Sequence, residues 1–291
     1  GDGVIRTDLA DGDSGFEYCD DGNLDDTDDC DRYCGRGIIA SANTLNSTCV
    51  AQHRGAVWCW GNIARRTDQN VTLRPIEIAI PERVVELIGV SNSDRFWGRS
   101  DHGKIYAWSG AFAHQISLGE RRAVRLKAYF GSGFTHAYVC AQDGVILKFA
   151  RLRSSHPQVL EGPAEGMVDC AILARGGESE AATFCALTPE RRVYCWGDNT
   201  WSQLGDGTDQ ATSVPQRAPI EPVLDFSLSG DSGGWRTCVL DEANDMWCWG
   251  NSAAGVVREP MRIEDLPKLG SLNPSWRLDS GAWLSSIVVD A

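Results

Sequence analysis

Residues 184–208 read FCALTPERRVYCWGDNTWSQLGDGT, and this stretch decides the fold. Its apolar start is separated from the apolar step VYCWG by the polar turn TPERR. Two short apolar segments joined by such a turn predict an antiparallel β-hairpin. Because Val193 and Cys195 alternate with Tyr194 and Trp196, both faces of the hairpin are apolar, and both are expected to be covered by other parts of the chain.

The same hairpin recurs along the chain. The equivalent steps are VWCWG at 57–61, IYAWSG at 105–110, VILKFA at 145–150, VYCWG at 193–197 and MWCWG at 246–250, which start 48, 40, 48 and 53 residues apart. Units of four short strands with a period near fifty residues predict an all-β fold, a β-propeller of four-stranded blades. Five copies are complete, and a sixth, beginning at RLDSGAWLSS (277–286), is half present at Ala291.

Cysteines support this hairpin register. In three copies, two cysteines stand ten residues apart and are centred on the turn, which makes them direct neighbours across two antiparallel strands. Opposed residues of this kind lie roughly 4.5 to 5.5 Å apart at Cα, within the range of a disulfide. The predicted disulfides are Cys49–Cys59, Cys185–Cys195 and Cys238–Cys248.

The two copies without these cysteines have lost both partners together. Trp97 and Ala107 stand at the equivalent positions of one copy, and Tyr138 and Lys148 at those of the other. This joint replacement favours bonded pairs over buried free thiols, and disulfides favour an extracellular location. The spacing of Cys140 and Cys170 permits a bond between them without requiring one.

Charge is distributed unevenly. Residues 1–31 hold twelve acidic residues and one basic residue, Arg6, which accounts for most of the net charge of −13. The rest of the chain has 26 basic and 28 acidic residues, so no basic surface for nucleic acid is expected. No apolar run is long enough to cross a membrane, so no membrane insertion of this segment is expected.

The stretch VYCWGDNTWSQLGDGT (193–208), followed by Pro215, resembles the repeat of the regulator of chromosome condensation propeller family. The resemblance covers residues 37–291, and the cysteine-bearing copies are similar to versions in secreted bacterial proteins. Members of this family usually close seven blades. The resemblance therefore implies six or seven blades here, either in a smaller ring or in one completed by sequence beyond Ala291. It also implies two alternative functions, guanine-nucleotide exchange on a small GTPase and inhibition of an enzyme by a secreted propeller.

Residues 1–36 form a second predicted domain, a small acidic module. GDG (1–3), EYCDDGN (17–23), Cys30 and Cys34 resemble the cysteine-rich repeat of bacterial surface proteins, especially those of myxobacteria. The resemblance implies a further cysteine just before Gly1 in the natural parent, and two disulfides that also use Cys19. Calcium could bind to carboxylate and amide oxygens of this module, although the EF-hand pattern fails and a solvated acidic loop is the alternative. The candidate ligands are Asp21, Asn23, Asp25, Asp26 and Asp28.

Residues 230–238 read GDSGGWRTC, and the first five letters are those around the nucleophilic serine of trypsin-like proteases. A serine nucleophile needs a histidine base and a carboxylate. None of the five histidines directly precedes a cysteine, as the protease pattern requires. The same junction recurs as FGSGFTHAY (130–138) and LDSGAWLSS (278–286), so Ser232 is predicted to be a loop serine in a repeat. No catalytic residue and no metal site are predicted in the propeller.

Three aromatic residues occupy or lie near this junction in different copies: Phe134, Trp235 and Trp283. They are the candidate binding residues, because exposed aromatics on one rim of a propeller would anchor a protein interface. The alternative is that they fold inward and pack in the central channel. Taken together, the sequence predicts a non-catalytic extracellular or cell-surface scaffold that binds a protein or surface ligand through rim loops and needs no cofactor.

Overall fold

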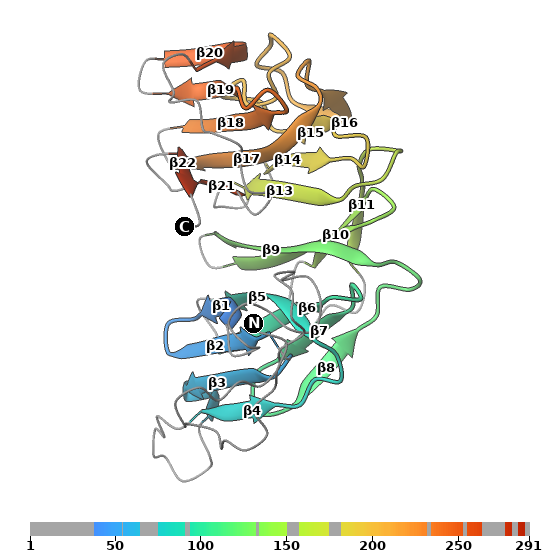
Figure 1. Ribbon diagram of the computed structural model, residues 1–291, viewed down its shortest axis with the longest axis vertical. Helices are drawn as coiled ribbons and strands as arrows, with labels where there is room; N and C mark the ends of the chain where they lie inside the picture. The colour runs from blue at the N-terminus through green and yellow to red at the C-terminus, as the bar shows by residue number, and fades with distance from the viewer. Residues whose placement is uncertain are drawn as a thin grey trace, which may run out of the picture. The chain divides into compact units, whose positions relative to one another are not determined.

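The computed structural model describes residues 38–53, 55–64, 75–90, 94–131, 134–149, 157–174, 182–231, 234–252, 255–263, 277–280 and 285–288. Two compact units divide the chain: unit 1 comprises residues 1–128, and unit 2 comprises residues 129–291 (Figure 1). The boundary falls within strand β9. The acidic module predicted at 1–36 lies outside the described residues.

Five four-stranded sheets, called blades 1 to 5, and one two-stranded sheet make up the described structure. Blade 1 consists of β1 (Ile38–Asn43), β2 (Ser47–Gln52), β3 (Val57–Gly61) and β4 (Ile76–Ile78), with a short 3-10 helix η1 (Asn62–Ala64) after β3. Blade 2 consists of β5 (Val84–Val90), β6 (Arg95–Ser100), β7 (Ile105–Trp108) and β8 (Ala113–Ile116). Blade 3 consists of β9 (Ala123–Gly131), β10 (Phe134–Ala141), β11 (Val145–Phe149) and β12 (Gln158–Glu161).

Blade 4 consists of β13 (Asp169–Ala174), β14 (Ala182–Leu187), β15 (Val193–Gly197) and β16 (Thr212–Arg217). Blade 5 consists of β17 (Val223–Asp231), β18 (Gly234–Asp241), β19 (Met246–Ser252) and β20 (Gly255–Arg262). The remaining strands, β21 (Arg277–Ser280) and β22 (Ser285–Val288), pair with each other. The all-β class and the four-stranded blades predicted from the repeat are confirmed, and each aromatic step begins the third strand of its blade.

The predicted register is confirmed at the cysteines. Cys185 opposes Cys195 in the β14–β15 pair, and the Cα atoms of the two are 4.1 Å apart in the disulfide. The other two hairpins, 49–59 and 238–248, are bonded at the same Cα separation of 4.1 Å. A fourth disulfide joins Cys140 on β10 to Cys170 on β13, so it connects blade 3 to blade 4. The structure therefore settles the pairing that the sequence left open.

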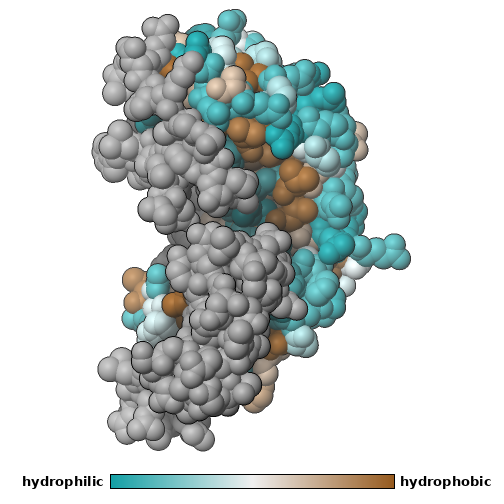
Figure 2. Space-filling model, viewed as in Figure 1, coloured by the Kyte–Doolittle hydropathy of each residue, from teal (hydrophilic) through white to brown (hydrophobic). Residues whose placement is uncertain are grey.

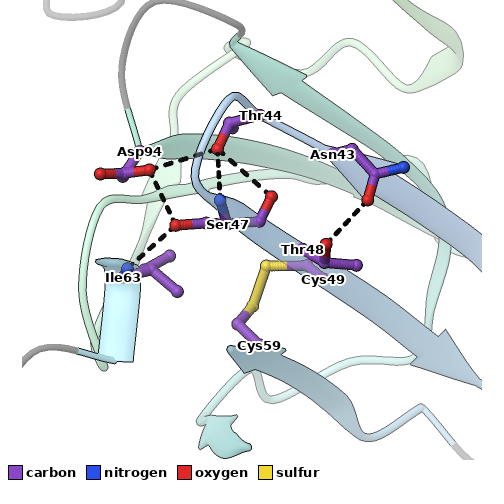
Figure 3. The surroundings of a disulfide bond; sticks show 8 residues. All are labelled: Asn43, Thr44, Ser47, Thr48, Cys49, Cys59, Ile63 and Asp94. Carbon is purple, nitrogen blue, oxygen red and sulfur yellow. Dashed lines mark hydrogen bonds between the residues drawn. A yellow bond between two sulfur atoms is a disulfide. The ribbon is translucent and has the colours of Figure 1, made fainter. Parts of the chain in front are cut away.

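A polar cluster links blade 1 to blade 2 beside the Cys49–Cys59 disulfide (Figure 3). Asp94, which directly precedes β6, accepts hydrogen bonds at Oδ1 from Ser47 Oγ (2.7 Å) and Thr44 Oγ1 (3.2 Å) of the β1–β2 turn. Ser47 Oγ in turn accepts a hydrogen bond from the backbone N–H of Ile63 (3.0 Å). These bonds satisfy polar groups at the edge of the apolar core of unit 1, where leaving them unpaired would be destabilising.

The third strand ends at a tight backbone approach in blades 1, 4 and 5, where Gly61, Gly197 and Gly250 stand. Gly197, at the end of β15, has φ of 100°, and an added Cβ atom would lie 2.0 Å from the carbonyl oxygen of Ala182. Only glycine fits such a position. The glycine of the aromatic step is therefore explained by the close approach of the neighbouring strand β14, and the chain can turn there into the loop at 198–211.

Candidate binding groove

An open groove in unit 2 is the candidate functional site. It lies between β12, the last strand of blade 3, and strands β14 to β16 of blade 4, and its volume is about 650 Å³. This size is in the range of clefts that hold a ligand or a short peptide segment. The lining residues are Val159, Leu160, Glu161, Ala182, Phe184, Trp196, Gly197, Asp198, Ala211, Thr212 and Ser213.

Two stacked aromatic rings belong to the lining. Phe184 on β14 directly opposes Trp196 on β15, and their ring centroids are 5.7 Å apart with nearly parallel planes. Tyr138 of blade 3 approaches the Phe184 ring edge-on at 6.0 Å. The strand alternation explains this arrangement, because the neighbouring pair Cys185–Cys195 belongs to a core shared with blade 5, while the aromatic pair faces blade 3.

The equivalent space between blades 4 and 5 is filled. There, the loop 198–211 places Leu204, 2% exposed, in one core with Trp249, the blade 5 counterpart of Trp196. The carbonyl oxygen of Gln203 accepts hydrogen bonds from Trp249 Nε1 (2.8 Å) and from Thr237 Oγ1 (2.7 Å). In blade 3 the corresponding connection is residues 150–157, which is shorter and contains no Gln-Leu-Gly sequence.

The loop 198–211 is itself fixed by buried side chains. Asn199 Oδ1 accepts a hydrogen bond from the backbone N–H of Leu204 (2.9 Å). Gln203 Nε2 donates to Thr183 Oγ1 (2.9 Å) and to the carbonyl oxygen of Asp198 (2.7 Å). Because both amide side chains are fully buried and hydrogen-bonded, the loop adopts one conformation and holds Asp198 at the groove.

The groove also has carboxylate groups that could accept further hydrogen bonds. Asp198 Oδ1 accepts hydrogen bonds from Thr200 Oγ1 (2.6 Å) and from its backbone N–H (3.2 Å). Asp198 Oδ2, by contrast, is buried and has no hydrogen-bond partner. Within the described part of the chain, neither Asp198 nor Glu161 takes part in an ion pair, so the groove keeps two uncompensated carboxylates.

Exposed apolar side chains flank the groove. Val159 on β12 is 50% exposed, and Val214, next to the lining residue Ser213 on β16, is 61% exposed. In the space-filling view, hydrophobic residues reach the surface of unit 2 over the region where Figure 1 places β13 to β15, within a mostly hydrophilic surrounding (Figure 2). An apolar patch beside unpaired acidic groups is typical of a surface that contacts a partner.

Of the three aromatic residues predicted as binding residues, Trp235 alone has a described side chain. Trp235 is 3% exposed and packs over Gly230, its partner across the β17–β18 pair. This burial favours the alternative of inward packing for Trp235. Phe134 lies at the start of β10 with its side chain outside the description, and Trp283 and Ser232 lie outside the described residues. A binding role for Phe134, Trp235 and Trp283 stays a prediction.

The predictions on metal binding and on membrane insertion concern other parts of the chain. The candidate calcium ligands of the acidic module lie outside the described residues, so calcium binding stays a prediction. Among the residues that the structure describes, no group of three or more metal-ligating side chains is present. A search of the same residues finds no helix that is long and apolar enough to cross a membrane.

Sequence reasoning did not find the groove. Its floor was predicted only as packing between blades, and its polar group, Asp198, stands in a stretch interpreted as part of the repeat. One signal was present in the sequence: the connection at 150–157 is shorter than the loop at 198–211 and lacks its Gln-Leu-Gly residues. A shorter connection between otherwise equivalent blades predicts a space between them that the longer loop fills elsewhere.

The repeated four-stranded blades with a covered face on each side define a β-propeller. Residues 192–235 match the family model of the regulator of chromosome condensation (RCC1) repeat. The chain is 22% identical over 246 residues to the human E3 ubiquitin-protein ligase HERC2, covering 75% of this chain and 5% of HERC2. It is likewise 22% identical over 246 residues to the ultraviolet-B receptor UVR8 of Arabidopsis thaliana, covering 73% of this chain and 54% of UVR8.

Among solved structures, yeast RCC1 (Prp20) bound to Kap60 resembles this chain with a TM-score of 0.52 and 15% identity, covering 83% of this chain and 65% of that one. The chain thus spans about half of UVR8 and a small fraction of HERC2. Together, the family match and these relatives identify the fold as a propeller of the RCC1 type. Yeast RCC1 in that structure binds a protein, Kap60.

Proposed function

We propose that this chain is a non-catalytic propeller of a secreted or surface-displayed bacterial protein, and that it binds a protein partner. The observation that carries the proposal is the set of four disulfides in the described residues, one of which joins two blades. Structural disulfides persist in oxidising compartments and are rare where glutathione keeps thiols reduced. An extracellular location is therefore the one in which this fold keeps its covalent links.

Protein binding is supported by the site. The groove between blades 3 and 4 combines apolar flanks, an aromatic floor and carboxylates without ion-pair partners. We propose that the partner contacts this groove as well as the rim loops. No cofactor is proposed for it. Because propellers hold such surfaces on rigid sheets, recognition needs little ordering of the backbone.

Location is tested on cells of the source organism with a membrane-impermeant amine label, followed by alkylation of thiols before and after reduction. The proposal expects labelling of the chain on intact cells, and alkylation of its disulfide cysteines only after reduction. A chain that is labelled only after lysis, with cysteines that alkylate freely while it is folded, would overturn the extracellular location.

Binding is tested by placing a photo-crosslinking amino acid at Val159, beside the groove, and at Glu120, an exposed position outside the groove. Crosslinking on intact cells is expected to give a discrete protein adduct from the first position and none from the second. Acceleration of nucleotide release from a small GTPase would contradict the proposal and favour the exchange function that the family resemblance implies. Stoichiometric inhibition of a secreted enzyme would instead identify the partner as that enzyme.

A further inference from the structure

We propose that the groove between blades 3 and 4 binds an arginine side chain, which a partner protein presents in an extended segment next to an apolar residue. This inference rests on the proposed function, because it names the chemistry that the protein partner would bring to the groove. It is carried by the charge of the groove, by its aromatic and apolar lining, and by the free edge of one of its strands.

Charge selects a cation. Asp198 Oδ2 is buried without a hydrogen-bond partner, and no ion pair of the described residues involves Asp198 or Glu161. A buried carboxylate oxygen that receives no hydrogen bond is destabilising, and a donor that enters the groove would remove this cost once the Asp198 side chain turns toward it. None of the described residues that line the groove is basic, so a cation has no competitor among these side chains.

The lining favours a guanidinium over an ammonium group. The stacked rings of Phe184 and Trp196, which are 9% and 3% exposed, form the floor of the groove that the two carboxylates also line. A guanidinium is planar, is weakly hydrated, packs well against aromatic rings and donates two parallel hydrogen bonds to a carboxylate. An ammonium group is a strongly hydrated point charge and would lose more hydration on entering an apolar groove.

The second wall of the groove suits an extended peptide. β12 is the last strand of blade 3, and among the described strands it pairs with β11 alone, so backbone groups on its outer edge are available to a further strand. On β16 the backbone groups of Val214 are already used by side chains of the same strand. Thr212 Oγ1 accepts a hydrogen bond from the Val214 N–H (3.1 Å), and Gln216 Nε2 donates one to the Val214 carbonyl oxygen (3.1 Å). The edge of β12 is therefore the one that would align a peptide.

The size and the apolar flanks of the groove indicate which residues of the partner segment lie next to the arginine. A volume of about 650 Å³ exceeds the needs of a single side chain, so neighbouring residues of the segment enter as well. Val159 in the lining and Val214 next to it offer exposed apolar surface. Between blades 4 and 5 the chain's own Leu204 fills the corresponding space, which shows that an aliphatic side chain is a suitable neighbour for the aromatic floor.

The test uses the full chain and three synthetic peptides: acetyl-Leu-Arg-Val-amide, the same peptide with citrulline in place of arginine, and the same peptide with lysine. Citrulline has the shape of arginine without its charge. Binding is measured by calorimetry and by shifts of the tryptophan indole resonances. The arginine peptide is expected to bind about tenfold or more tightly than the citrulline peptide, as loss of a charge-assisted hydrogen bond implies.

Variants assign the effect to the groove. Asp198→Asn and Glu161→Gln are each expected to weaken the arginine peptide several-fold, while Glu120→Gln, which removes an exposed carboxylate outside the groove, leaves the affinity unchanged. Circular dichroism checks the fold of each variant. If Asp198→Asn fails to fold, Glu161→Gln still decides the question, because its side chain is on an exposed strand position.

Several outcomes would overturn the inference. They are equal affinity for the arginine and citrulline peptides, equal or tighter binding of the lysine peptide, and an equal loss of affinity in all three variants. Concentration-dependent self-association that Val159→Asp abolishes would overturn it too, since the occupant would then be a second copy. A failed peptide titration leaves the proposed extracellular location untouched, because that proposal is tested by surface labelling and alkylation.

Discussion

Replacing Cys140 and Cys170 together by alanine should destabilise the chain more than replacing Cys185 and Cys195 together. The first disulfide closes a sequence separation of 30 residues and the second a separation of 10. In the chain-entropy description, a cross-link stabilises the fold by restricting the unfolded chain, and the effect grows with the logarithm of loop length. For these separations it gives about 3.6 kcal/mol for the bond between blades and about 2.7 kcal/mol for the hairpin bond.

The comparison is well matched, because the four cysteines are equally buried. Their exposed fractions lie between 0% and 2%, so the cavities left by alanine and the lost apolar contacts are similar in the two variants. The expected difference of about 1 kcal/mol in the free energy of unfolding therefore reflects loop length. The Cys140–Cys170 bond also holds two different sheets together, whereas the hairpin bond duplicates a pairing that backbone hydrogen bonds already make.

Urea unfolding followed by tryptophan fluorescence and by far-ultraviolet circular dichroism measures the two free energies. Both variants are compared with the parent chain in its oxidised form, and the m-values of the three proteins should agree. An equal or smaller loss in the variant without the bond between blades would refute the reasoning. Such a result would mean that residual structure in the unfolded chain, rather than loop length, sets the effect of each cross-link.

Three further changes test single contacts. Leu204→Ala should lower the free energy of unfolding by about 2 to 5 kcal/mol, because it leaves a cavity beside Trp249, and calorimetry that finds less than 1 kcal/mol would contradict this. Ser202 has φ of 57° and a buried hydroxyl without a hydrogen-bond partner. Ser202→Gly should therefore raise the free energy of unfolding by about 1 kcal/mol, measured as a shift of the urea midpoint. Tyr194 donates a hydrogen bond to Glu165 (2.7 Å) that holds the pKa of this carboxyl below its ordinary value, so Tyr194→Phe should raise that pKa in a nuclear magnetic resonance titration. Because the folded-state pKa is the lower one, the stabilisation is present above the ordinary pKa and is lost as the pH falls through the folded value, a dependence that the variant should lack.

Local features of the sequence determined the blades and most of their covalent links. The register of each hairpin follows from alternation along the strand and from a short turn, both of which act within a dozen residues. For that reason the pairs 49–59, 185–195 and 238–248, and the matched replacements Trp97 with Ala107 and Tyr138 with Lys148, could be placed before the structure was seen. The repeat period then sufficed to name the fold, since a unit that cannot cover its own faces must stack on its neighbours.

Contacts between repeats were decided by the tertiary structure alone. The Cys140–Cys170 bond, the packing of Trp235 over Gly230 and the groove all depend on how one blade faces the next, which no spacing within a single repeat encodes. The groove is the sharpest case: Trp249 packs in one core with Leu204 between blades 4 and 5, whereas its counterpart Trp196, also buried, lines the groove between blades 3 and 4. Sequence specified the hairpins because their interactions are local and periodic. Packing between blades specified the site because it depends on side chains that meet from different repeats.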